Sequence, residues 1–284
     1  MGKLIETLQR VGKSSGGSMG FLGKNQAQSK AKAAGILVAL GQADAGAVEA
    51  VAKAGADGVI FVVSADKSAS KGFSAAAYQK AAEPLRAANR PWGIDLAAVV
   101  SSLPADALKG IREGGADFVS FPLDAPARLL QERPEGLDRI VTIRGPAGDD
   151  DDERYLRLVR SVNLLSVQVV ELISHLSAER LHDLRIEELL HYRTVRELLR
   201  FPVIASLRGD LGNEEARLLV KLGISAIILQ ATEGESTAAL AQRVAALREE
   251  LERVPAPGSE DEDMPSLAFA PGSPARGEEP NRQH

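Results

Sequence analysis

The sequence contains no cysteine, few aromatic residues (4%) and only four histidines in 284 residues. The absence of cysteine excludes disulfides, thiolate metal sites, iron–sulfur clusters and a cysteine nucleophile. All apolar runs are too short for a helix that spans a bilayer, and the N-terminus does not follow the pattern of a secretory signal. A net charge of −5 argues against nucleic-acid binding. We therefore expect a cytoplasmic protein with no membrane and no nucleic-acid partner.

The composition divides the chain into three regions. Residues 1–34 carry a net charge of +5 and contain an amphipathic stretch, Lys3–Val11, followed by a glycine- and serine-rich linker. We expect this stretch to form a helix that packs on the main domain or on a second subunit; the alternative is docking on an anionic membrane. Residues 255–284 contain six prolines and an acidic run, which predicts a disordered tail. Residues 35–254 are predicted to form the folded domain.

Strand and helix signals alternate along residues 35–254. The predicted strands are Ile36–Leu40, Gly58–Val63, Trp92–Ala97, Phe118–Leu123, Arg139–Arg144, Leu165–Leu172, Val203–Leu207 and Ser225–Leu229. The predicted helices are Ala45–Ala54, Ser74–Asn89, Pro104–Glu113, Ala125–Glu132, Glu153–Val162, Asn213–Leu222 and Ser236–Arg253, and residues 174–200 form a longer helical insertion. The chain thus alternates strands with helical crossovers throughout this region.

One short sequence pattern recurs at the junctions between a helix and the strand that follows it. A glycine ends the helix and an apolar strand follows, at Gly55 before Gly58–Val63, at Gly114-Gly115 before Phe118–Leu123, and at Gly223 before Ser225–Leu229. Near-continuous apolar runs are typical of parallel strands buried on both faces. A strand–helix unit of roughly 25–30 residues repeated eight times predicts an α/β fold, a (β/α)8 TIM barrel. The alternative is an open doubly wound sheet, although no Gly-x-Gly-x-x-Gly follows the first strand.

The stretch Pro202–Leu229, together with Ile36–Val63 and the glycine junctions, resembles the aldolase-type, phosphate-binding branch of the TIM barrels. That branch includes indole-glycerol-phosphate synthase, thiazole synthase and FMN-dependent barrel enzymes. The resemblance covers most of residues 35–254. It implies a site at the carboxyl ends of the strands, with a phosphate held by the glycine-rich loops after strands seven and eight.

Asp95 is the first candidate for chemistry, because it interrupts an apolar strand. A buried carboxylate is costly unless it is paired, and Arg144 and Arg208, at the ends of later strands, are the expected partners. We predict that Asp95 is a catalytic acid/base group and that Arg144 and Arg208 hold an anionic substrate. The alternative is that the three residues form a structural Arg–Asp network inside the barrel.

The second candidate is a cup for an anion. Gly209 and Gly212 follow the seventh strand, and Gly234 and Ser236 follow the eighth. We predict that these four residues bind substrate; the alternative is two ordinary loops with helix caps. Two further predicted substrate-binding residues lie on the sixth strand and on the loop after the second strand, respectively Gln168 and Lys67.

The sequence leaves the cofactor unknown and predicts no metal site. His175, His182 and His191 are separated by seven and nine residues, which matches no common metal motif. The predicted ligand is a small anionic metabolite carrying phosphate or carboxylate. Amphipathic outer helices leave room for a homo-oligomer.

Three functions are consistent with these features. The first is an enzyme of the lyase, isomerase or synthase type with Asp95 as its acid/base group. The second is a non-catalytic barrel that binds a ligand or serves as a scaffold, which the acidic loops after strands seven and eight favour. The third is an FMN-dependent barrel enzyme, although few aromatic residues are available to stack on a flavin ring.

Overall fold

The strands close into a barrel. The computed structural model describes residues 2–11, 32–63, 75–145, 152–177, 181–208, 211–232 and 234–255, without the side chains of 174–177, 208 and 213. The barrel runs in chain order from β1 to β8, every neighbouring pair is parallel, and β8 pairs with β1. The predicted (β/α)8 barrel is therefore confirmed, and the open doubly wound sheet is excluded.

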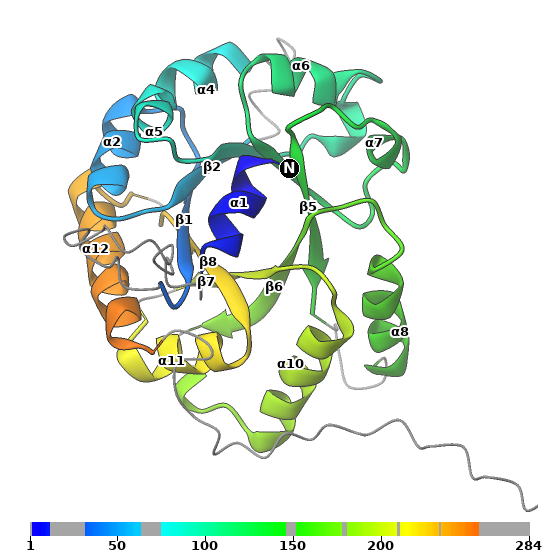
Figure 1. The fold of residues 1–284 in the computed structure, drawn as a ribbon, viewed down its shortest axis with the longest axis vertical. Helices are drawn as coiled ribbons and strands as arrows, with labels where there is room; N and C mark the ends of the chain where they lie inside the picture. The colour runs from blue at the N-terminus through cyan, green and yellow to red at the C-terminus, as the bar shows by residue number, and fades with distance from the viewer. Residues whose placement is uncertain are drawn as a thin grey trace, which may run out of the picture.

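Helices surround the barrel on its outside (Figure 1). The strands are β1 (Gly35–Leu40), β2 (Gly58–Val62), β3 (Trp92–Asp95), β4 (Phe118–Pro122), β5 (Asp138–Arg144), β6 (Val169–Ser177), β7 (Val203–Arg208) and β8 (Ile224–Gln230). The helices are α1 (Lys3–Gln9), α2 (Ala45–Lys53), α4 (Ala75–Ala81), α5 (Glu83–Ala87), a 3-10 turn (Val100–Ser102), α6 (Ala107–Glu113), α7 (Arg128–Gln131), α8 (Asp152–Val162), α10 (Ile186–Leu198), α11 (Asn213–Lys221) and α12 (Thr237–Arg253). In the described part of the chain, no helix combines the length and the apolar character needed to cross a membrane.

Two predicted elements differ from the observed ones. The helix expected over Ser74–Asn89 is divided into α4 and α5, because Pro84 lacks the N–H that a continuous helix would use and stands instead in the first turn of α5. The strand expected at Leu165–Leu172 begins later, at Val169. No glycine ends α8, and turns continue the chain past it, with the Leu165 amide donating to the Val162 carbonyl at 2.9 Å.

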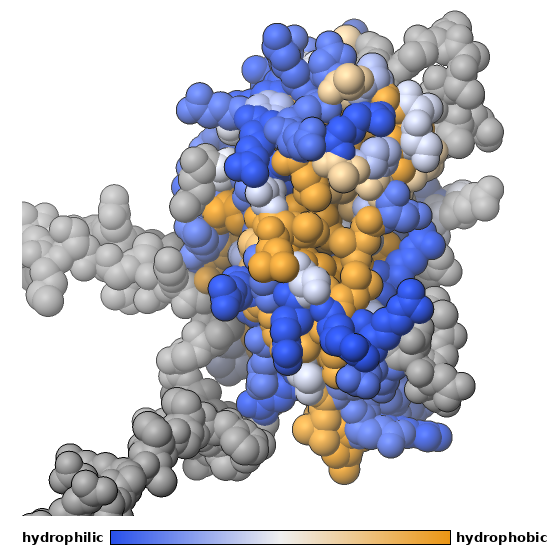
Figure 2. Space-filling model, turned by 90° about the vertical axis from the view of Figure 1, so that its right-hand side faces the viewer, coloured by the Kyte–Doolittle hydropathy of each residue, from blue (hydrophilic) through white to orange (hydrophobic). Residues whose placement is uncertain are grey.

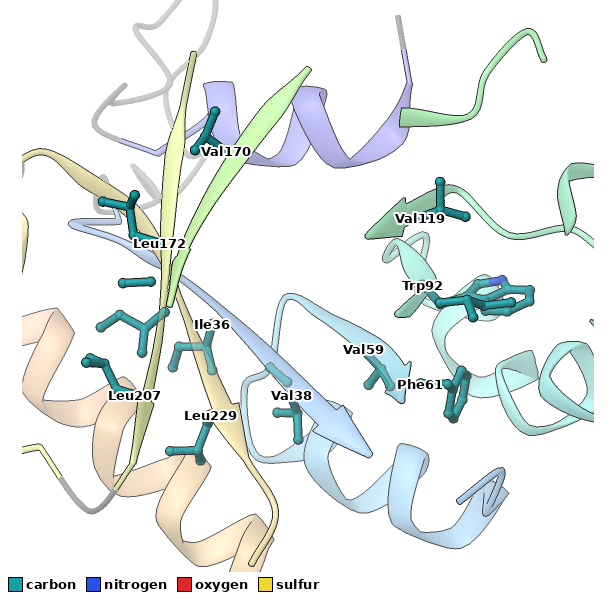
Figure 3. Close-up of a cluster of buried hydrophobic side chains, with 14 of the residues drawn as sticks. Ile36, Val38, Val59, Phe61, Trp92, Val119, Val170, Leu172, Leu207 and Leu229 are labelled. Atoms are coloured by element: carbon teal, nitrogen blue, oxygen red, sulfur yellow. The ribbon is translucent and has the colours of Figure 1, made fainter. Parts of the chain in front are cut away.

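The main hydrophobic core lies between the strands and the outer helices. Alternate strand residues point outward into this layer, as Figure 3 shows for Val38, Phe61, Leu172, Leu207 and Leu229. All of them are almost completely buried. The other strand side chains point into the barrel, so the residues buried in the outer layer show which ones face the interior.

Aspartates fix the ends of strands at the amino side of the barrel. Asp57, which precedes β2, accepts a hydrogen bond from the Ile36 amide of β1 at 2.9 Å. Asp117, which precedes β4, accepts one from the Trp92 amide of β3 at 3.2 Å. Asp57 and Asp117 both follow the glycine of a helix–strand junction, and both therefore have a structural role. Each carboxylate satisfies a strand amide that the parallel ladder leaves unpaired.

Helix α1 closes the amino end of the barrel. In Figure 1 it lies across the barrel opening. Leu4, Ile5 and Leu8 are buried against apolar side chains of the barrel interior, and the Ile5 amide donates to Asp138 Oδ2 at 3.0 Å. The interior side chains of this cluster are Leu37, Ala39, Ile60, Phe118, Ile140, Val169, Ile204, Ala226 and Ile228. Of the arrangements considered from the sequence, the structure therefore has the helix packed on its own domain.

Loss of the α1 contact should destabilise the whole barrel. Leu4 is fully buried, so Leu4→Ala should lower the free energy of unfolding by about 2–5 kcal/mol in urea titration. Glu6→Ala, on the exposed side of the same helix, is the matched control and should change it little. Equal effects of the two substitutions would contradict the packing of α1 inside the barrel end.

Candidate active site at the carboxyl ends of the strands

A layer of polar side chains lies inside the barrel above its apolar floor. Ser120, Thr142, Glu171 and Ser206 each follow by two residues an interior member of the α1 cluster on the same strand, so they also point inward. All four are buried. The sequence did not identify Glu171 as a site residue, nor did it group the hydroxyl residues around it, because their meeting depends on how the strands close.

Glu171 is held by three hydroxyl groups. Ser120 Oγ and Thr142 Oγ1 donate to its Oε2 at 3.2 and 3.0 Å, and Ser206 Oγ donates to its Oε1 at 2.5 Å. These three residues come from β4, β5 and β7, so the carboxylate joins strands on both sides of β6. We call this group the Glu171 cluster. Its hydroxyls favour the ionised form, because each supplies a proton to a carboxylate oxygen.

Asp95 is the second carboxylate of the interior. It is in register with Ser120 on β4, and the preceding inward position, Gly93, lies directly against the Phe118 ring. Its carboxylate accepts a hydrogen bond from the Ala97 amide, which donates to Oδ1 at 3.0 Å. Asp95 is partly exposed, whereas Glu171 is buried, so Asp95 is the carboxylate nearer the opening of the barrel.

Burial and like charge govern the protonation of these two groups. Burial raises the pKa of Asp95, and the Ala97 amide offsets only part of that effect. Burial also raises the pKa of Glu171, the nearby Asp95 raises it further, and the Ser206, Thr142 and Ser120 hydroxyls oppose the rise. Two neighbouring carboxylates repel each other when both are ionised, so Asp95 and Glu171 titrate as a coupled pair.

The two predicted arginines lie at the ends of their strands. Arg144 is the last residue of β5, on the inward row of Thr142, and is exposed. None of the ion pairs formed by the described side chains joins it to Asp95, and it is not among the causes of the Asp95 pKa shift. Arg208 ends β7, and its side chain lies outside the described residues. The structure therefore brings Asp95 together with Glu171, and it does not pair Asp95 with Arg144.

Gln168 lies at the other end of the barrel. The sequence placed it within a strand, but β6 begins only at Val169. The Gln168 Oε1 atom accepts a hydrogen bond from the Arg139 amide at 2.8 Å, which is the same role that Asp57 and Asp117 have at their strands. The predicted position of Gln168 at the carboxyl ends of the strands is therefore wrong, because the turns after α8 delay the start of β6 to Val169.

The loops after β7 and β8 are described in part. Gly212 precedes α11 without a side-chain cap, and Gly234 has a φ of 77°, a backbone region that favours glycine. Ser236 caps α12, since its Oγ accepts from the Ala239 amide at 3.2 Å. Gly209 and Lys67 lie outside the described residues. Of the predicted anion site, the structure therefore describes the starts of α11 and α12 and the turn at Gly234.

Glu235 is neutralised inside the loop after β8. Its Oε2 accepts from the Thr232 amide and from Arg243 Nη1, both at 2.9 Å. Burial would raise the pKa of Glu235, but these two donors outweigh it and the pKa is lowered. The sequence led us to expect that this carboxylate would repel a phosphate. Its pairing with Arg243 reduces that repulsion.

Metal-ligating side chains do not gather in the described ranges: no three of His, Asp and Glu come together there in a way that would hold a metal ion. His191 contacts Asp152 at 3.9 Å on the outer helices, and His182 contacts Glu215 at 3.4 Å. These two histidines are separate from the interior carboxylates, in agreement with their interpretation as surface or packing residues.

Comparison with known proteins defines the class of fold. No protein-family model matches the sequence, and no curated protein matches it. Among solved structures, orotidine 5'-phosphate decarboxylase from Pyrococcus horikoshii has a TM-score of 0.55 at 15% identity, covering 77% of this chain and 100% of that one. Thiamine phosphate pyrophosphorylase from Pyrococcus furiosus has a TM-score of 0.52 at 15% identity, covering 78% and 96%.

A chain of the tryptophan synthase complex from Pyrococcus furiosus has a TM-score of 0.55 at 14% identity, covering 78% of this chain and 97% of that one. The chain described here is thus a (β/α)8 barrel similar in fold to these proteins. The resemblance to the aldolase-type, phosphate-binding barrels that the sequence indicated is confirmed at the level of the fold.

The raised pKa of Glu171 predicts a specific dependence of stability on pH. A carboxyl whose pKa is raised by folding stabilises the folded state below its unfolded pKa, and this contribution is lost as the pH rises through its folded pKa. Glutamine cannot ionise, so wild type should lose stability relative to Glu171→Gln as the pH rises above about 4, near the unfolded pKa of a glutamate, by at most about 1.4 kcal/mol per pH unit. Urea unfolding of both proteins across this range measures the difference.

The control for that experiment is Glu113→Gln, which removes an exposed carboxylate on α6. Its free energy of unfolding should follow that of wild type across the same range. A difference between wild type and Glu171→Gln that stays constant, or that moves in favour of wild type as the pH rises, would contradict the raised pKa.

Proposed function

We propose that this protein is an enzyme of the lyase, isomerase or synthase type that acts on a small metabolite carrying phosphate or carboxylate, with Asp95 as its acid/base group. The observation that carries the proposal is the pair formed by Asp95 and Glu171 inside the carboxyl end of the barrel. Buried carboxylates with raised pKa values are typical of acid/base sites, and enzymes of this fold place their chemistry at this end.

The contacts of the two carboxylates suggest which one holds a proton. Glu171 is buried and the neighbouring Asp95 raises its pKa further, whereas Asp95 is partly exposed and accepts from the Ala97 amide. A single proton on the pair then resides on Glu171, and Asp95, the group nearer the opening, is the anion. Asp95 would begin the reaction as a base that accepts a proton from the substrate. Glu171 would act as a positioning residue, because its protonated carboxyl places no second negative charge beside Asp95.

The anionic part of the substrate would bind above this pair. Arg144 and Arg208 end neighbouring parts of the rim, and a guanidinium pairs well with a carboxylate or phosphate. Gly209, Gly212, Gly234, Ser236 and Lys67 would complete the anion site. Two of the similar structures have a phosphate ester in their names, orotidine 5'-phosphate decarboxylase and thiamine phosphate pyrophosphorylase, which favours a phosphate over a carboxylate. Gln168 has no part in the proposed site, because it lies at the amino end.

The second candidate is a barrel that binds a ligand or a partner without catalysis. One observation favours it: among the described residues, the three groups that donate hydrogen bonds to Glu171 are all side chains of the barrel itself. Such a satisfied network is also a way to build a polar core. A screen by thermal unfolding distinguishes the ligand classes, since a ligand at 100 times its dissociation constant stabilises by about 2.7 kcal/mol. The screen should include phosphorylated sugars, keto acids and FMN.

Replacement of Asp95 tests its role as an acid/base group. Once the screen identifies a substrate, Asp95→Asn should lower kcat by about 10²–10⁴-fold, because the amide keeps the shape of the carboxylate but cannot accept a proton. Substrate affinity should change much less. Steady-state kinetics and binding titration measure the two effects, with Glu113→Gln as the control for loss of a carboxylate remote from the barrel opening.

Full turnover by the Asp95→Asn variant would remove Asp95 from the mechanism. Absence of stabilisation by every anion in the screen would favour the non-catalytic barrel instead.

A further inference from the structure

The surface of the barrel has two features that the proposed site does not use. Figure 2 shows apolar side chains gathered on one outer face, with hydrophilic ones around them. The other feature is a cavity of about 400 Å³ at the amino end of the barrel, which we call the amino-end cavity. Its volume falls within the range of sites for small ligands, about 300–1,000 Å³. Its lining is charged, so it specifies the kind of ligand that it can bind.

Three cations from three helices line the amino-end cavity. Lys3 is the first residue of α1, Arg86 lies on α5 and Arg112 lies in the last turn of α6. Gly115 follows α6 with a φ of 90°, a backbone region that favours glycine, and it contributes no side chain to the cavity. Asp117 is the acidic residue among the described lining residues. These residues therefore give the cavity a net positive charge.

The cations do not form close pairs with Asp117. Lys3 Nζ is 3.9 Å from Asp117 Oδ2 and Arg112 Nη1 is 3.9 Å from Oδ1, and both distances exceed that of a hydrogen bond. The Arg86 side chain forms no hydrogen bond or ion pair with a described residue, although its charge acts on Asp117. Burial raises the pKa of Asp117, and the Trp92 amide and the three cations offset only part of that effect.

The corresponding aspartate of β2 shows a close pairing in the same fold. Asp57 also precedes its strand and accepts a hydrogen bond from a strand amide. Lys32 Nζ and Arg248 Nη2 each lie 2.5 Å from an oxygen of its carboxylate, so Asp57 neutralises the cations beside it. The cations around Asp117 lack such contacts. Their charge is therefore available to an anion in the amino-end cavity.

A buried hydrogen-bond donor lies beside the same cavity. Trp92 is fully buried, and its Nε1–H has no hydrogen-bond partner among the described residues. The indole edge that carries Nε1 also carries Cζ2, which is 3.9 Å from the position that a Cβ on Gly115 would take. An unpaired buried N–H is unfavourable and calls for an acceptor. The indole N–H thus adds a neutral donor to the three cations near Gly115.

The arrangement of these donors determines the class of anion. Arg112 is held in place, because its Nε and Nη1 donate to the Glu135 and Ala116 carbonyls, each at 3.0 Å. Lys3 and Arg86 reach the cavity from two other helices. Cations from three directions can each contact a different oxygen of a tetrahedral phosphate, whereas a carboxylate offers only two oxygens in one plane.

We propose that the amino-end cavity binds a small anion of the phosphate class, such as inorganic phosphate or diphosphate, through Lys3, Arg86 and Arg112. This site lies at the opposite end of the barrel from Asp95 and Glu171, so it is a second site and does not depend on the proposed function. Lys3 belongs to α1, whereas the two arginines belong to outer helices. A bound phosphate therefore links α1 to the barrel that it closes.

The fluorescence of Trp92 gives a local measurement of binding, because Trp92 is the single tryptophan of the chain. Titration of the full chain with inorganic diphosphate at constant ionic strength should change this emission until the site is saturated. Calorimetry should give the same dissociation constant. Arg86→Gln and Lys3→Gln should each raise that constant by about tenfold, since each removes one charged contact to the anion.

Two control variants locate the site. Arg160→Gln removes an exposed arginine of α8 and should leave the dissociation constant unchanged. Arg144→Gln, at the carboxyl end, should also leave the Trp92 titration unchanged. If Arg144→Gln abolishes diphosphate binding and Arg86→Gln does not weaken it, the anion binds only at the carboxyl end. That result would overturn this proposal and support the proposed function.

Two further results would overturn the proposal. One is the absence of diphosphate binding to wild type in both fluorescence and calorimetry. The other is an equal affinity of Arg86→Gln and Arg160→Gln for diphosphate, since the first variant removes a cation of the amino-end cavity and the second does not.

Discussion

The hydroxyl groups around Glu171 are what allow this barrel to hold a carboxylate at its centre. A carboxylate removed from water is strongly destabilising unless donors replace the lost water. Ser120, Thr142 and Ser206 supply three such donors from three different strands. Because β5 and β7 pair with β6 on its two sides and β4 lies beyond β5, the cluster requires the strand order β4-β5-β6-β7, and a sheet interrupted in this region would break it.

Asp57 and Asp95 show how neighbouring charges decide the state of the same side chain. Asp57, at the amino end, is held by Arg248 and Lys32, whose charges outweigh burial and lower its pKa. Asp95, at the other end, accepts from the Ala97 amide and has a neighbouring carboxylate, and its pKa is raised by burial. The ionised Asp57 therefore satisfies a strand amide and stabilises the fold. The Asp95–Glu171 pair is costly to ionise, so stability alone does not account for it.

The sequence was sufficient to predict the closed barrel, because apolar strands and glycine junctions are properties of local stretches. It also predicted Asp95, since a charged residue inside an apolar strand is visible without coordinates. The partner of Asp95 was not predictable in this way. The choice between Arg144 and Glu171 depends on how strands lie around a closed ring. Gln168 was misplaced for a related reason: the exact start of β6 depends on the turns that follow α8, and no glycine marks that boundary.

The proposed site lies at the carboxyl end of the barrel, and α1 fills the amino end. With Leu4, Ile5 and Leu8 filling the amino end, the apolar floor is closed to water from below. In the proposed function a ligand reaches Asp95 and Glu171 from the carboxyl ends of the strands. There it would meet Arg144 and Arg208, which end β5 and β7. An anionic group would bind these arginines while the remainder of the ligand extends toward Asp95 and Glu171. The order of positive and negative groups along the barrel axis would therefore orient the ligand in the proposed site.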